Sequence, residues 1–181
     1  MILNGATIFV EPLKEQPRYG VKSIGNSFYP ENLYGAAITS MRIDIPYQPG
    51  QTIYGRETWH NEADYWETER PIYKAANRDW VMNSGGKWLS PATMPKSAAR
   101  IFLHITGVTV KRCNEVTEGD ASEMGIDRSL AHRFNIACGE SKWDIPFRSV
   151  YRALYIDRFG AESWERGDYI WLVSFNRVEK P

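Results

Sequence analysis

Apolar residues recur at every second position over several short stretches of the chain, a pattern typical of β-strands. Residues 52–59 form one predicted strand, which follows a Pro-Tyr-Gln-Pro-Gly turn. Residues 100–111 predict a strand pair or one bent strand, with Gly107 marking a bulge or turn. Residues 168–178 are apolar on both faces, which predicts a central strand covered on both sides. Residues 1–35 predict short strands and loops.

Two helices are predicted in the second half of the chain. A Thr-Glu-Gly-Asp capping box and the later Gly125 predict a short helix over residues 118–124. A longer helix is predicted over residues 145–158, where Asp144 can cap the first turn and Gly160 can end the last. The apolar stripe of this helix consists of Phe147, Val150, Tyr151, Leu154 and Tyr155.

The order of these elements predicts an α+β fold. Strands dominate, and closing them into a small mixed or antiparallel β-barrel with peripheral helices would remove exposed sheet edges. A length of 181 residues favours a single domain over residues 1–181. Within it, residues 60–95 have the character of a long insertion. The insertion is either a lid or binding loop, or only a solvated excursion.

The overall charge gives no general attraction to nucleic acid or membrane. Basic and acidic residues both number 22. No apolar stretch approaches the roughly 18–20 residues that span a bilayer, and the N-terminal residues lack a basic signal region, so we expect a cytoplasmic protein. Cys113 and Cys138 favour reduced thiols, and three scattered histidines show no ligand spacing. No metal, cofactor or membrane partner is therefore expected, and the oligomeric state stays open.

A local positive patch is nonetheless predicted, because residues 91–114 contain neither Asp nor Glu. Contacts with phosphate groups require only such a patch. In the alternative interpretation, Arg100 pairs with Glu57 or another acid for structural reasons and the other cations are solvated. The cations of the patch are Lys96, Arg100, Lys111 and Arg112.

The best candidates for a ligand contact lie on the predicted strand 52–59. Tyr54 and Arg56 share one face of it, because side chains alternate along a strand. A guanidinium can stack on a base and bond its edge, and a tyrosine ring can stack as well. Glu57 and Trp59 lie on the opposite face, and we expect Trp59 in the core. The candidate ligand-binding residues are Tyr54, Arg56, Glu57, Lys96 and Arg100.

Four segments resemble those of a known family in order and spacing. Residues 50–59 read Gly-Gln-Thr-Ile-Tyr-Gly-Arg-Glu-Thr-Trp, and residues 94–101 read Met-Pro-Lys-Ser-Ala-Ala-Arg-Ile. Residues 117–126 read Thr-Glu-Gly-Asp-Ala-Ser-Glu-Met-Gly-Ile, and residues 155–178 contain a Ser-Trp pair before a closing strand. They resemble the ASCH-domain family, PUA-like barrels common in phages and prophages. The resemblance covers about residues 44–178.

The resemblance implies a barrel that binds RNA or modified nucleosides in a cleft. Some small relatives hydrolyse acylated cytidine, using a Gly-x-Lys-Thr-x-Thr-x-Arg stretch near the N-terminus and the Glu of a Glu-Gly-Ile segment. In this chain the Lys-Thr stretch is missing, and Met124 stands at the position of that Glu. Glu123 lies one residue early and is the one candidate catalytic acid, provided that its helix is offset by a residue.

Three functional hypotheses follow from the sequence. The first is a phage-type domain that binds RNA, single-stranded nucleic acid or a modified nucleotide in the barrel cleft without catalysis, in the host cytoplasm. The second is a phage accessory protein that inhibits a host defence or regulatory protein, with five acidic residues between positions 57 and 69 as a nucleic-acid mimic. The third is a residual N-acylcytidine amidohydrolase.

Overall fold

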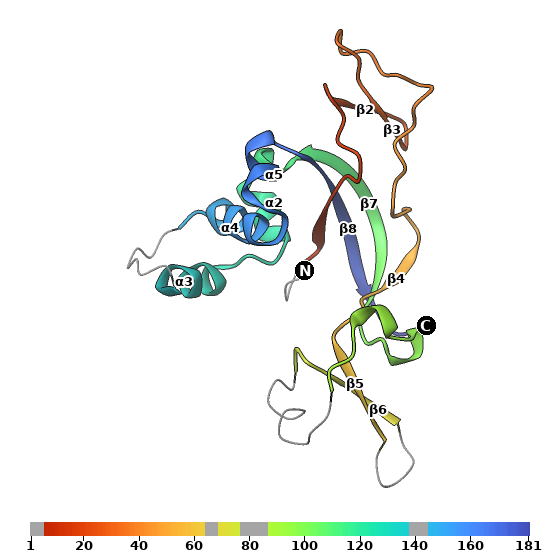
Figure 1. The fold of residues 1–181 in the computed structure, drawn as a ribbon, viewed down its shortest axis with the longest axis vertical. Coiled ribbons are helices and arrows are strands. Elements are labelled where there is room, and N and C mark those ends of the chain that lie inside the picture. Colours follow the sequence, from red (N-terminus) through yellow and green to blue (C-terminus); the bar gives the residue numbers. More distant parts are fainter. Residues whose placement is uncertain (1–5, 64–68, 77–86, 138–144) are drawn as a thin grey trace. The chain divides into compact units, whose positions relative to one another are not determined.

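The computed structural model describes residues 6–63, 69–76, 87–137 and 145–181 (Figure 1). The chain divides into two compact units, each of which combines segments that are distant in the sequence. The first unit comprises Met1–Gln51 and Ile105–Phe175, and the second comprises Thr52–His104 and Asn176–Pro181. The described part is a mixed α+β structure with antiparallel strands and four α-helices.

The central strand of the first unit is β8 (Tyr169–Val178). It pairs antiparallel with β1 (Ile8–Pro12), so that Val10 lies opposite Leu172. Strand β7 (Phe102–Arg112) is hydrogen-bonded to its other edge. Consecutive β8 residues of both faces, from Ile170 to Val173, are buried. The prediction of a central strand covered on both sides is therefore confirmed.

Strand β7 settles the choice between a strand pair and one strand. It continues through Gly107 without a turn, so one strand is observed, and of the bulge or turn predicted at Gly107 the turn is not. A Cβ at Gly107 would lie 3.9 Å from the side chain of Ser174 on β8, an ordinary contact between neighbouring strands. The pairing with β8 thus keeps the backbone extended at a residue whose type alone favours a turn.

The predicted short helix is α2 (Glu118–Glu123). Thr117 caps it, because its hydroxyl accepts a hydrogen bond from the Asp120 N–H at 3.1 Å. The Asp120 carboxylate accepts in return from the Thr117 N–H at 2.9 Å. This reciprocal arrangement is the capping box that the sequence predicts.

The predicted longer helix is α4 (Phe147–Phe159), which ends at Gly160 with φ 90°. Asp144, its predicted cap, lies outside the described residues. The first two backbone N–H groups of α4 donate instead to the two carboxylate oxygens of Glu118, at 2.8 and 3.1 Å. A carboxylate on another helix therefore satisfies donors that a helix start leaves without intrahelical partners.

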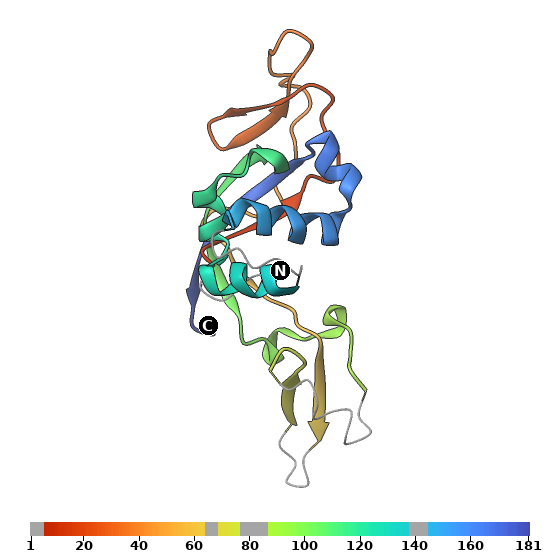
Figure 2. The ribbon, with the colours of Figure 1, turned by 90° about the vertical axis from the view of Figure 1, so that its left-hand side faces the viewer.

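Two helices were not predicted. The first is α3 (Arg128–Ala137), and the second is α5 (Ala161–Arg166), which ends at Gly167 with φ 65°. Helices α2, α4 and α5 lie on one face of the strands of the first unit (Figure 2). Their apolar side chains and those of β1 and β8 form the main core of this unit.

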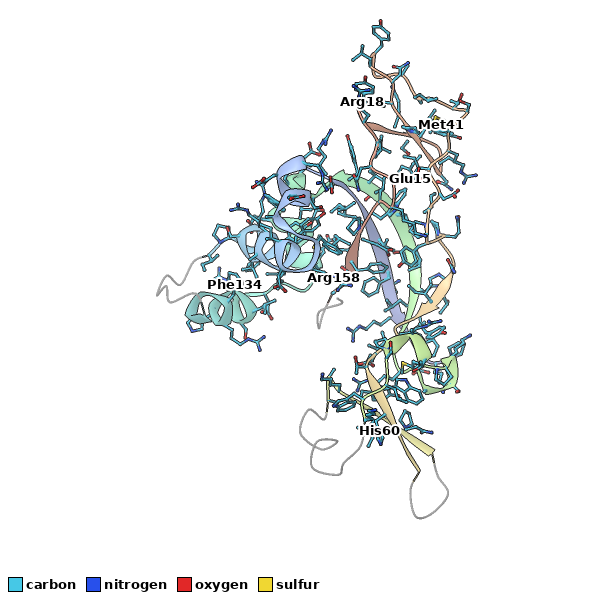
Figure 3. The ribbon with its side chains drawn as sticks, in the orientation of Figure 1. Glu15, Arg18, Met41, His60, Phe134 and Arg158 are labelled. Carbon is cyan, nitrogen blue, oxygen red and sulfur yellow. The ribbon has the colours of Figure 1, made fainter. Side chains whose placement is uncertain are left out.

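An N-terminal hairpin of β2 (Val21–Ile24) and β3 (Ser27–Pro30) also belongs to the first unit. Phe28 anchors it, because its ring meets that of Trp171 edge to face at 5.0 Å between centroids. The chain beyond β3 exposes apolar side chains, and Figure 3 shows Met41 among them. This agrees with the short strands and loops predicted for the N-terminal region.

In the second unit the predicted strand 52–59 is interrupted. Strand β4 (Thr52–Tyr54) pairs with the first residues of β7, and a new strand, β5 (Trp59–Ala63), begins after four intervening residues. The expectation of one strand is therefore wrong. Trp59 is buried with Met94 and Ala98 in a separate small cluster. Burial in that cluster is the physical reason why the chain leaves the edge of β7.

The expected insertion, residues 60–95, contains regular structure. Strand β5 pairs antiparallel with β6 (Glu69–Tyr73), and two short 3-10 helices follow. The acidic side chains expected to act as a mimic lie outside the described side chains, Glu57 excepted. The 3-10 helices are η1 (Pro91–Thr93) and η2 (Lys96–Ala98).

A partly buried ion pair in the first unit predicts a loss of stability in acid. Lys111 Nζ donates to the Asp120 carboxylate at 2.6 Å. Burial raises the pKa of Asp120, but the hydrogen bonds from Lys111 and Thr117 outweigh it and hold this pKa below its ordinary value. The ionised form is therefore more stable in the folded chain, and its contribution is present above about pH 4 and lost as the pH falls further.

Asp120→Asn should consequently lower the free energy of unfolding more at pH 7 than at pH 3. Urea unfolding of both proteins at the two pH values measures this difference. A destabilisation of equal size at pH 7 and pH 3 would show that the charge of Asp120 makes no contribution.

Candidate functional site

Tyr54 and Arg56 form a pair at the end of β4. An Nη of Arg56 donates to the Tyr54 hydroxyl at 3.1 Å, and the guanidinium carbon lies 5.4 Å from the centre of the Tyr54 ring. The other Nη donates to the carbonyl of Ala92 in η1 at 3.3 Å. Arg56 is exposed and Tyr54 is half-buried. The two side chains therefore lie together, as predicted, although Arg56 lies beyond the end of β4.

The guanidinium of Arg56 is available to a ligand. Within the described part of the chain, no carboxylate lies within ion-pair distance of its guanidinium. Its two contacts, with a hydroxyl and a carbonyl, fix the orientation of the group without neutralising it. An oriented, solvent-facing guanidinium can stack on a flat ring or donate to a phosphate or carboxylate.

Arg100 and Glu57 instead form a salt bridge with each other. Arg100 donates from Nε and Nη2 to the two carboxylate oxygens of Glu57 at 2.7 and 2.8 Å. Its guanidinium also lies 4.1 Å from the centre of the Tyr73 ring, and the Tyr73 hydroxyl donates to the carbonyl of Ala98 at 2.6 Å. The hydrogen bond to Glu57 is the main cause that raises the pKa of Arg100. This geometry favours the structural alternative for both residues.

The predicted positive patch is divided between the units. Lys96 is exposed on η2 in the second unit, where Arg100 also lies. Lys111 and Arg112 belong to the first unit and form hydrogen bonds there. Lys111 pairs with Asp120, and Arg112 donates to the carbonyl of Gly167 at 3.0 Å. Arg56 and Lys96 are therefore the better candidates for contacts with phosphate.

The first unit contains an apolar hollow that the sequence did not predict. It lies between β1, the end of α2 and the C-terminal half of α4, and is a half-open depression whose space of about 480 Å³ includes open solvent. Figure 3 shows Arg158 on the side of α4 that faces β1. The walls include Val10, Met124, Leu154 and Phe159, and Arg158 is the charged residue among them.

Met124 and Glu123 occupy different environments. The Met124 side chain is buried and lines the hollow, whereas Glu123 is exposed. The carbonyl of Glu123 accepts from the Thr7 N–H at 2.8 Å, which fixes the backbone at this point. A methionine thus lines the hollow at the sequence position for which the resemblance implied a carboxylate.

Two tyrosines in the walls of the hollow are neutral at ordinary pH. Burial raises the pKa of Tyr155 to about 12, and its hydroxyl lies 2.8 Å from the Ser163 hydroxyl. Burial also raises the pKa of Tyr151, whose hydroxyl is buried without a hydrogen-bond partner in the described structure. The charge available to a molecule in the hollow therefore comes from Arg158.

The described residues place further limits on the site. No group of three or more His, Cys, Asp or Glu side chains among them could hold a metal ion. None of the described helices is long and apolar enough to cross a membrane. Cys113 is a buried free thiol, and Cys138 lies outside the described residues. Comparisons with protein-family models, curated proteins and solved structures found no match to this chain.

Proposed function

We propose that this chain is an ASCH-like domain of the PUA type that binds RNA, single-stranded nucleic acid or a modified nucleotide without hydrolysing it. The observation that carries the proposal is the Tyr54–Arg56 pair. It presents an aromatic ring beside an exposed guanidinium that has a fixed orientation and keeps its charge. Aromatic stacking combined with a cation is the common means by which proteins hold unpaired bases.

The fold supports this proposal at the level of its elements. Strands β4, β7 and β8 and the capped helix α2 lie within residues 44–178, the part of the chain that resembles the family, whereas β1 lies before it. We propose further that these strands form the PUA-like barrel, with the helices at its periphery. The Tyr54–Arg56 pair lies within the first of the family-like segments, residues 50–59.

The environment of Met124 supports binding rather than hydrolysis. A thioether can neither donate nor accept a proton at neutral pH, so it cannot replace a carboxylic acid in acid–base catalysis. The exposed Glu123 does not line the same hollow. Loss of one member of a catalytic group removes most of the rate, because such members do not act independently.

A titration with single-stranded RNA at two salt concentrations tests the proposal. Arg56→Ala should weaken binding to all sequences and reduce the salt slope by about 0.7, the value for one phosphate contact on a single strand. Tyr54→Ala should cost about 1–3 kcal/mol with little change in slope, and Tyr54→Phe should retain the stacking contribution. Fluorescence anisotropy of a labelled RNA measures the affinity of the wild-type protein and of the three variants.

Arg128→Ala is the matched control, because it also removes one exposed positive charge but lies on α3 in the first unit. It should bind RNA as the wild-type protein does. Circular dichroism establishes that each variant is folded. If the folded wild-type protein does not bind RNA even at low salt, the nucleic-acid proposal fails and the hypothesis of a host-protein partner replaces it.

A further inference from the structure

The hollow of the first unit combines an apolar wall with a single cation. We propose that it binds a small aromatic carboxylate, independently of any nucleic acid bound by the second unit. The wall of the hollow has an apolar surface, offers few hydrogen bonds and carries one charge.

The apolar surface comes from three elements. On α4 the lining residues Tyr151, Leu154, Tyr155 and Arg158 recur at helical spacing, so they form one continuous face. Strand β1 lies across from this face, and Met124 closes the space at the end of α2. Aromatic walls favour a ring that packs edge to face or offset, and a thioether adapts to the shape of such a ring. The body of the ligand is therefore an aromatic ring.

The wall offers few hydrogen bonds to a buried polar ligand. The hydroxyl of Tyr155 is already bonded to Ser163, and the hydroxyl of Tyr151 is covered by neighbouring atoms. A nucleobase has donors and acceptors along its edge, and burying them without partners costs free energy. This property separates the hollow from the RNA site proposed above and excludes a nucleobase as its preferred occupant.

The charge specifies the other end of the ligand. Arg158 is exposed, and its guanidinium carbon lies 5.4 Å from the centre of the Phe159 ring. Within the described part of the chain, no acidic side chain pairs with it. The planar guanidinium matches a carboxylate through two parallel hydrogen bonds. A ring in the hollow with a carboxylate at Arg158 thus satisfies both parts of the site.

Methyl-detected NMR of the full chain with labelled methionines tests the proposal. The chain has five methionines, and Met124→Leu assigns the signal of Met124. The probes are 3-phenylpropionate, its neutral amide 3-phenylpropanamide, and octanoate, which replaces the ring with an alkyl chain. We expect 3-phenylpropionate to shift the Met124 signal saturably, with the amide about tenfold weaker because the charged hydrogen bonds are lost. Octanoate should bind more weakly than 3-phenylpropionate.

Variants of α4 separate the charge from the shape. Arg158→Gln should weaken the binding of 3-phenylpropionate to the affinity of the amide, and Arg158→Lys should restore part of the lost affinity. Arg152→Gln is the matched control, since Arg152 is an exposed arginine of the same helix that stacks on Trp164 and does not line the hollow. It should leave binding unchanged. RNA binding should be the same for Arg158→Gln and the wild type.

Leu154→Trp fills the hollow and should abolish binding of the acid and the amide alike, if the variant folds. If it does not fold, the comparison of acid with amide on the wild-type protein decides alone. The proposal is overturned if acid and amide bind equally, if octanoate binds as well as the aromatic acid, or if millimolar probe leaves the Met124 signal unmoved.

Discussion

Trp171→Ala should lower the free energy of unfolding by about 3–5 kcal/mol, the usual cost of emptying an aromatic site in a core. Trp171 is 2% exposed and lies on the central strand β8. Its ring meets Phe28 edge to face, so the truncation also removes the anchor of the N-terminal hairpin. The neighbouring strands are hydrogen-bonded on both edges of β8 and cannot move in to fill the space.

Urea unfolding followed by circular dichroism measures the change. Tyr34→Ala is the matched control, because it also truncates an aromatic side chain of the first unit, one that is 89% exposed. It should change the free energy of unfolding by no more than about 0.5 kcal/mol. An unfolding midpoint for Trp171→Ala equal to that of the wild type would contradict the place of this residue in the core.

The elements that the sequence predicts best are those whose signals are local. Strand β8 carries apolar residues on both faces from Tyr169 to Val173, and α4 carries an apolar stripe at helical spacing. The capping box of α2 needs only Thr117 and Asp120, three residues apart. Patterns of this kind survive into the structure because burial follows the same periodicity.

The errors lie where distant residues decide. Strand 52–59 breaks because Trp59 packs with Met94 and Ala98, more than thirty residues later in the chain. Gly107 stays extended because β8 lies beside it.

Helix α3 was missed although a local signal exists. Asp127 accepts from the Leu130 N–H at 2.7 Å, and an aspartate before a short run of helix-forming residues is a recognisable cap.

The candidate site, too, could be predicted only where its residues are close in the sequence. Tyr54 and Arg56 lie together as predicted, although Arg56 lies beyond the last residue of β4. The pairing of Arg100 with Glu57, 43 residues apart, follows from tertiary structure and could be foreseen only as an alternative. The hollow is formed by β1, α2 and α4, and no pattern within one segment indicates that these three enclose a space. The stripe on α4 would have suggested Arg158, one turn beyond Leu154.

Arg100→Gln should destabilise the second unit by about 1.5–3 kcal/mol, the range for hydrogen bonds to a charged group. The Glu57 side chain is only 14% exposed and would lose both of its charged hydrogen bonds. Solvent reaches the 41% exposed Arg100 side chain and screens the pair, which places the expected value near the lower end. The stacked Tyr73 ring would also lose its cation.

Hydrogen exchange resolves this effect by unit, because the Gly55 N–H donates to the Ile101 carbonyl in the second unit at 2.8 Å. Its protection should fall in Arg100→Gln, while that of β8 amides in the first unit should not. The double variant Glu57→Gln, Arg100→Gln should be more stable than Arg100→Gln alone, because it no longer buries an unpaired carboxylate. Lys96→Gln, which removes a neighbouring exposed charge, should leave protection unchanged. If Arg100→Gln kept full protection at Gly55 but bound RNA weakly, Arg100 would be a ligand contact and the structural interpretation would be wrong.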